Sequence, residues 1–159
     1  MPETISVPEA GTALPDIPLV LADGTSARLA EQIAGRPAVI FFMRAADCAI
    51  CAAHGRALER MAAAGELGDA RAIVIAPGDA AAARTAAARI RGSHLAVAAS
   101  GEHHADLGLG RFLMLQHSGT FVTDADGRII DAVTSALPTA SFSAAKVRAV
   151  LDALGRSAS

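Results

Sequence analysis

Residues 38–51 of this chain read AVIFFMRAADCAIC, and they set the plan of the whole sequence. The first six residues are continuously apolar, which is typical of a strand buried in the centre of a sheet. Residues 52–61 consist mostly of strong helix formers, so a helix is predicted directly after this strand. The only two cysteines of the chain, Cys48 and Cys51, fall at the junction. The sequence therefore predicts two thiols, one helical turn apart, at a strand-to-helix turn.

This position favours reactive thiols. The first N–H groups of a helix have no partner within the helix, and together with the helix dipole they stabilise a thiolate. Such surroundings lower the pKa of a cysteine from about 8.5 into the range of roughly 3.5–7.5, and the thiolate is the reactive form. Cys48 and Cys51 are therefore interpreted first as a redox pair that exchanges electrons between a dithiol and a disulfide.

Two other interpretations of the pair remain open. Free cysteines are often inert, small apolar residues of a core. A CxxC motif is also half of a zinc site, for which His54 would be a third ligand. A closed zinc site needs a fourth ligand, and the sequence contains no second CxxC. His103 and His104 would complete the site only if the fold brought them close to Cys48 and Cys51.

The composition limits the classes of function. A length of 159 residues fits a single domain, and the net charge of −2, with basic residues scattered singly, argues against nucleic-acid binding. No apolar run approaches the ~18–20 residues that span a bilayer, and the first residues lack a secretory signal. We therefore expect a cytoplasmic protein. In that reducing compartment a CxxC motif is more often catalytic or metal-binding than a permanent structural disulfide.

The rest of the sequence predicts an α/β fold. Residues 1–13 are expected to form an extended arm, and residues 14–155 a single domain. Asp23-Gly24 and Asp126-Gly127 are hairpin signals, the first of them in an N-terminal β-hairpin. Between the hairpins, strands and helices are expected to alternate, with further strands at 71–76 and 95–98, helices at 29–34, about 80–91 and 141–154, and a helical turn at 101–109. This order indicates a mixed central sheet flanked by helices.

Several of these segments resemble the redoxin family, which includes peroxiredoxins and thioredoxin-like reductases. The similarity extends from about Val7 to Leu154. It is carried by GTALPDIPL at 11–19, by GRPAVIFF at 35–42 and by GTFVTDADGRI at 119–129. The loop at 43–51 is similar to a subgroup with the pattern Arg-Ser-Ala-Asp-Trp-Cys-Pro-x-Cys, although the tryptophan and the proline are missing here.

The resemblance implies a thioredoxin-like fold and a thiol-dependent oxidoreductase with antioxidant activity, either a thiol peroxidase or a thiol-disulfide oxidoreductase. Its substrate would be a peroxide or a disulfide, with no metal or organic cofactor. An external thiol reductant, such as a thioredoxin-like or glutathione-type donor, would restore the dithiol, and a homodimer is compatible with the family. A metal-binding or redox-sensing protein without turnover is the alternative.

The resemblance leaves the roles of the two cysteines open. Likeness to thioredoxin makes Cys48 the attacking thiol and Cys51 the resolving one. A count along a peroxiredoxin loop places the peroxidatic cysteine at Cys51 instead. Peroxiredoxins also have a proline at the site of Arg44, and an arginine near Ser118 that activates peroxide; this chain has neither.

Other side chains near the pair are candidates for the site. Arg44 ends the apolar strand, and its guanidinium would stabilise a thiolate or hold a peroxide oxygen. His54, one turn beyond Cys51, would act as a proton donor or thiolate partner. Asp47 is expected to be the N-cap of the helix. The three remaining candidates are expected on the surface or in loops: His103, His104 and His117.

Overall fold

The structure is a computed structural model that describes residues 8–107, 109, 111–112, 115–135 and 138–157. The strands are β1 (Pro18–Leu21), β2 (Ser26–Arg28), β3 (Ala38–Phe42), β4 (Arg71–Ala76), β5 (Ala96–Ala99), β6 (Arg111–Phe112), β7 (Leu115–Gln116), β8 (Ser118–Thr123) and β9 (Ile129–Ser135). The helices are α1 (Leu29–Ile33), α2 (Ala49–Ala63), α3 (Ala80–Ile90) and α4 (Ala144–Ser157), with the 3-10 helices η1 (His103–Leu107) and η2 (Pro138–Ala140).

Seven strands form one mixed sheet in the order β2-β1-β5-β4-β3-β8-β9. Strands β3, β4 and β5 are parallel, because a helix returns the chain after each of the first two. The two hairpins extend the sheet antiparallel, with β1 beside β5 and β8 beside β3. The α/β fold with a mixed central sheet and an N-terminal hairpin is therefore confirmed.

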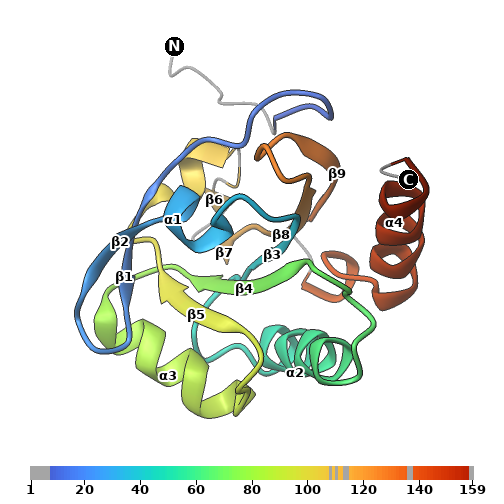
Figure 1. Cartoon of the computed structure of the whole chain (residues 1–159). Coiled ribbons are helices and arrows are strands. Elements are labelled where there is room, and N and C mark those ends of the chain that lie inside the picture. Colours follow the sequence, from blue (N-terminus) through green and yellow to red (C-terminus); the bar gives the residue numbers. More distant parts are fainter. Residues whose placement is uncertain (1–7, 108, 110, 113–114, 136–137, 158–159) are drawn as a thin grey trace.

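The side chains of β3 divide between two cores. Val39 and Phe41 face the layer that contains α2, α3 and α4. Ile40 and Phe42 face the opposite layer, which contains α1 and η1. Figure 1 shows α2 and α3 below the sheet and α1 above it. Because all five residues of β3 are buried, this strand is a fixed support for the segment that follows it.

The predicted elements agree closely with the observed ones. The strand expected at 38–43 is β3, and the two hairpin turns have Gly24 and Gly127 at positive φ, as such turns require. The pair of short strands β6 and β7 was not predicted, because neither has more than two residues. Of the expected arm, residues 1–7 lie outside the described residues, and Gly11 donates to the carbonyl of Ile129, 2.7 Å away.

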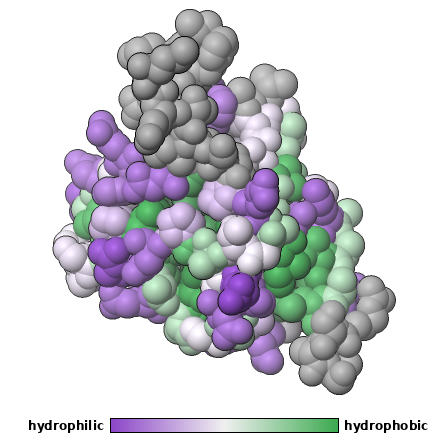
Figure 2. Space-filling view, turned by 90° about the horizontal axis from the view of Figure 1, so that it is seen from above, coloured by the Kyte–Doolittle hydropathy of each residue, from purple (hydrophilic) through white to green (hydrophobic). Residues whose placement is uncertain are grey.

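Polar and apolar residues are unevenly distributed over the face of the molecule that is seen from above. Hydrophilic residues cover the left of the face seen from above, and hydrophobic colour gathers toward the right, the side of β9 and α4 (Figure 2). Val150 and Leu151 of α4 are half-buried and pack against the core below the sheet. Among the described residues, no helix has the length and apolar character needed to cross a membrane.

Candidate active site

The outer cysteine caps the helix that follows β3. Cys48 has an extended backbone, with φ −71° and ψ 116°, and its sulfur accepts a hydrogen bond from the backbone N–H of Cys51 at 3.4 Å. The prediction that Asp47 is the N-cap was wrong. The helix begins one residue later than expected, so the side chain of Cys48, not the exposed one of Asp47, meets the free N–H groups of the first turn.

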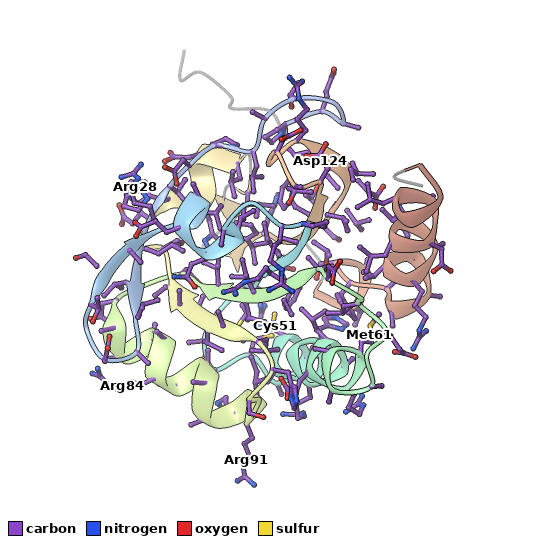
Figure 3. The ribbon with its side chains drawn as sticks, in the orientation of Figure 1. Arg28, Cys51, Met61, Arg84, Arg91 and Asp124 are labelled. Atoms are coloured by element: carbon purple, nitrogen blue, oxygen red, sulfur yellow. The ribbon has the colours of Figure 1, made fainter. Side chains whose placement is uncertain are left out.

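The inner cysteine lies beneath the sheet. Cys51 has no exposed surface, whereas Cys48 is 6% exposed. The sulfur of Cys51 accepts a hydrogen bond from the backbone N–H of Arg44 at 3.3 Å. Figure 3 shows Cys51 between the start of α2 and the strands above it. The two cysteines are free thiols and are not joined by a disulfide in this structure.

The surroundings of the two thiols give them different pKa values. Burial raises the pKa of Cys48, but the N–H and thiol of Cys51 and the Arg44 guanidinium outweigh it, and the pKa falls below its ordinary value. Burial is also the main influence on Cys51, and it raises the pKa of that thiol to about 12, with a further contribution from Cys48. Cys48 is therefore the thiol that ionises first.

Arg44 acts on both cysteines. Its backbone N–H donates to the sulfur of Cys51, and its guanidinium charge lowers the pKa of Cys48. The Nε atom of the same guanidinium is buried and has no hydrogen-bond partner among the described residues. A cavity of about 1000 Å³ opens beside this arginine, between β1 and the turns that follow β4 and β5. Arg44 and Ala45 are the residues between β3 and α2 that line this cavity.

His54 is half-buried on α2, one turn after Cys51. Its ring packs edge-on against Phe41, with ring centres 5.6 Å apart, and lies 5.3 Å from the ring of Phe142 in a tilted arrangement. These contacts tie α2 to β3 and to the segment before α4. They show a packing role for the imidazole; the sequence-based expectation of proton transfer stays a prediction.

The expectation that His104 is a surface or loop residue was wrong. Its side chain is fully buried, and the edge of its ring meets Phe42 with ring centres 5.0 Å apart. Its Nε2 lies 3.0 Å from the carbonyl oxygen of Met43, a residue 61 positions earlier in the chain. No local pattern could reveal this contact, because the fold alone brings η1 to the end of β3. Its neighbour His103 is half-exposed and pairs with Asp106.

The other side of the β3 terminus is formed by β8. Ser118 is 1% exposed, and among the described residues its Oγ has no hydrogen-bond partner.

In the part of the chain that the structure describes, no group of three or more His, Cys, Asp or Glu side chains is placed to hold a metal ion.

The sequence of residues 9–151 matches the family model described as Redoxin. The chain belongs to the redoxin family. This match covers both cysteines, the whole seven-stranded sheet and most of α4. No curated protein matches the sequence of this redoxin.

Solved structures show the same fold at low sequence identity. A peroxiredoxin-like protein from Aquifex aeolicus has a TM-score of 0.79 and 14% identity, covering 95% of this chain and 90% of its own. A thiol peroxidase from Chromobacterium violaceum has a TM-score of 0.80 and 17% identity, with 98% and 93% covered. Peroxidoxin BcpB from Mycobacterium tuberculosis has a TM-score of 0.73 and 24% identity, with 92% and 97% covered. These likenesses confirm the predicted thioredoxin-like fold of this redoxin.

Proposed function

We propose that this redoxin is a thiol peroxidase in which Cys48 attacks the substrate and Cys51 resolves the oxidised product. The proposal rests on one observation: the two cysteines lie in different surroundings. Cys48 keeps some exposure, accepts the N–H of the first helical turn, and has its pKa lowered by that N–H and by the charge of Arg44. Cys51 is fully buried, and its pKa is raised. A nucleophile needs a populated thiolate, and Cys48 has the surroundings that provide one.

Arg44 favours a peroxide over a disulfide as the oxidant. Its side chain lines the cavity, and its charge lowers the pKa of Cys48. A peroxide oxygen is a good acceptor for the N–H groups of a guanidinium, whereas the sulfur atoms of a disulfide are weak acceptors. Arg44 would thus hold the peroxide beside the thiolate and stabilise the charge that develops on the leaving oxygen.

The proposed cycle has two steps on the protein. The Cys48 thiolate attacks one peroxide oxygen, the O–O bond breaks, and the leaving oxygen takes a proton to become water or an alcohol. Cys48 is then a sulfenic acid. Cys51 loses its proton and attacks the sulfur of Cys48, the S–O bond breaks, and water leaves as the Cys48–Cys51 disulfide forms. The pair has given two electrons to the peroxide, and an external dithiol or two monothiols would restore it.

The test is a titration of three proteins with hydrogen peroxide, followed by mass spectrometry of the cysteine peptides. The wild type should form one intramolecular disulfide. Cys51→Ser should accumulate sulfenic acid and higher oxidation states at Cys48, because the resolving thiol is absent. Cys48→Ser, which keeps only the buried thiol, should react far more slowly.

The opposite pattern, with rapid oxidation of Cys51 in Cys48→Ser, would move the nucleophile to Cys51. If neither single variant is oxidised while both remain folded, the protein is not a peroxidase. A disulfide substrate offered in place of peroxide then tests the reductase activity of the same pair.

A further inference from the structure

His104 occupies a specific place at the end of β3. It belongs to η1, its side chain has no exposed surface, and its ring packs against Phe42 in the core above the sheet. Cys51 lies in the core on the other side of the sheet. The two side chains are therefore separated by the backbone that leaves β3, which is the Met43–Arg44 peptide group.

The hydrogen bonds of the imidazole determine which nitrogen carries the proton. Nε2 lies 3.0 Å from the Met43 carbonyl oxygen, and because a carbonyl can only accept, Nε2 must donate. Nδ1 lies 2.6 Å from Oγ of Ser100. In the neutral ring this nitrogen accepts, so the Ser100 hydroxyl donates to it. Ser100 is itself held in place, since its backbone N–H donates to the carbonyl of Ala76 at the end of β4.

The same peptide group also faces Cys51. The carbonyl of Met43 accepts from His104, and the N–H of Arg44, in the same amide plane, donates to the sulfur of Cys51 at 3.3 Å. A hydrogen bond to an amide oxygen draws electron density from the amide nitrogen and makes its N–H a stronger donor. The chain of bonds from Ser100 through His104 therefore ends on the resolving sulfur.

We propose that His104 is a positioning residue for Cys51: by donating to the Met43 carbonyl, it orients and polarises the amide that hydrogen-bonds the Cys51 sulfur. This proposal rests on the proposed function, in which Cys51 resolves the oxidised Cys48. The Arg44 N–H stabilises the Cys51 thiolate that forms during resolution. Loss of the His104 donor weakens that hydrogen bond, and closure of the disulfide should slow by about two- to tenfold.

The closure step is measured with an aryl disulfide whose released thiolate absorbs visible light. The Cys48 thiolate attacks one sulfur of the reagent and releases the first aryl thiolate. Cys51 then loses its proton to solvent, attacks the Cys48 sulfur and releases the second aryl thiolate. The pair is oxidised to one disulfide and the reagent is reduced to two thiolates, so the rate of the second release is the rate of closure.

A second readout needs no substrate. In isotope-labelled, reduced protein, the amide proton resonance of Arg44 reports the hydrogen bond to Cys51. In His104→Leu this resonance should move upfield, and the second release should slow. In His104→Gln the side-chain amide can still donate to the Met43 carbonyl, so both values should return toward those of the wild type. The matched control is His103→Gln on the adjacent, half-exposed histidine, which should leave the Arg44 resonance unchanged.

The proposal is overturned if folded His104→Leu keeps both the Arg44 resonance and the closure rate of the wild type. It is also overturned if His104→Gln loses both values as completely as His104→Leu. Should His104→Leu fail to fold, Ser100→Ala removes the partner of Nδ1 and should move the Arg44 resonance part of the way; no movement there refutes the proposal. Absence of peroxide turnover in the wild type would refute the proposed function and leave the resonance test intact.

Discussion

The backbone N–H of Cys51 points at the sulfur of Cys48, 3.4 Å away. The residue proposed to resolve the oxidised product therefore also favours the thiolate form of Cys48, and it does so through its backbone. Replacement of the Cys51 side chain removes the second thiol but leaves this N–H in place. The two functions of residue 51 can thus be separated by mutation.

The first prediction concerns the acidity of the separate thiols. In Cys51→Ser, the alkylation rate of Cys48 should follow a pKa below the ordinary value of a cysteine thiol, because the first-turn N–H and Arg44 favour the thiolate. In Cys48→Ser, the remaining thiol should not titrate in the neutral range, because burial raises the pKa of Cys51 to about 12. Alkylation rates measured against pH check both; equal profiles would refute the division of roles.

The second prediction concerns Arg44. Arg44→Leu should raise the pKa of Cys48 and slow its reaction with peroxide by at least about tenfold, since it removes a positive charge that favours the thiolate. Stopped-flow kinetics in Cys51→Ser would measure the step directly. The matched control is Arg84→Leu, an exposed arginine of α3 that donates to the carbonyl of Ala22 and should not affect the thiol. Equal rates for the two variants would exclude Arg44 from the site.

The third prediction concerns the packing of the helix that carries the pair. Gly55 lies where α2 meets α3, and a Cβ atom there would stand 2.6 Å from Cδ1 of the buried Ile90. Gly55→Ala should destabilise the protein by about 1–3 kcal/mol through overpacking, although alanine is the better helix former. Adding Ile90→Val, which removes Cδ1, should restore part of the loss.

Gly155 is the control for this experiment. It lies in α4, and a Cβ atom there would meet nothing within 4 Å. Gly155→Ala should therefore stabilise the protein by up to about 1 kcal/mol. Urea denaturation of the variants measures both effects; a stabilising Gly55→Ala would show that α2 and α3 have room to move apart.

The fourth prediction concerns the stability of the protein at acidic pH. Glu59 of α2 accepts from the backbone N–H groups of Ser93 and His94 and from the His94 ring. Burial raises the pKa of Glu59, but these hydrogen bonds outweigh it, and the pKa lies below its ordinary value. Because the pKa is lower in the folded state, the stability it contributes is complete above the unfolded value of about 4.3 and is lost as pH falls below it.

Thermal denaturation of the wild type and of Glu59→Gln tests whether this contribution to stability is lost as the pH falls. The wild type should be the more stable protein at neutral pH, and the difference should shrink as the pH falls below about 4.3. The control is Glu66→Gln, which removes one partner of an exposed ion pair with Arg148 and should show a smaller difference. A difference that grows in acid would contradict the prediction.

The fifth prediction concerns His54. Because its ring contacts Phe41 and Phe142, His54→Phe should preserve both the melting temperature and the alkylation rate of Cys48. His54→Ala should lower the melting temperature, because it leaves a space between two aromatic rings. A folded His54→Phe protein with slow peroxide reduction would instead support the proton transfer expected from the position of His54 on the helix.

Local signals in the sequence accounted for most of the fold. The apolar run of β3 and the glycines of the two hairpins each act over a few residues, so they are visible in the sequence. The Cys48–Cys51 spacing likewise identified the candidate pair. What distinguishes the two thiols was visible only in part, because burial of Cys51 depends on how α2 lies against the sheet.

Two predictions were wrong: that Asp47 is the N-cap of the helix and that His104 lies on the surface or in a loop. Asp47 has the better capping side chain, but α2 begins after Cys48, whose sulfur accepts the N–H of Cys51. His104 looks like a residue of a polar loop, and only the approach of η1 to β3 buries it. For His104, a contact between distant segments outweighed local preference.

Because β3 lies between β4 and β8, the strand side of the site should be more rigid than the turn that follows it. All five residues of β3 are paired on both sides, so their amides should exchange with solvent only when the protein unfolds globally. The Met43 amide, bonded to Ile75, continues this protected region to the edge of the redox pair. Residues 45–47, in the turn before the helix, have no strand partner. We therefore expect their amides to exchange faster than those of β3, and local opening of this turn would expose Cys48 to solvent while the N–H of Arg44 still holds the sulfur of Cys51.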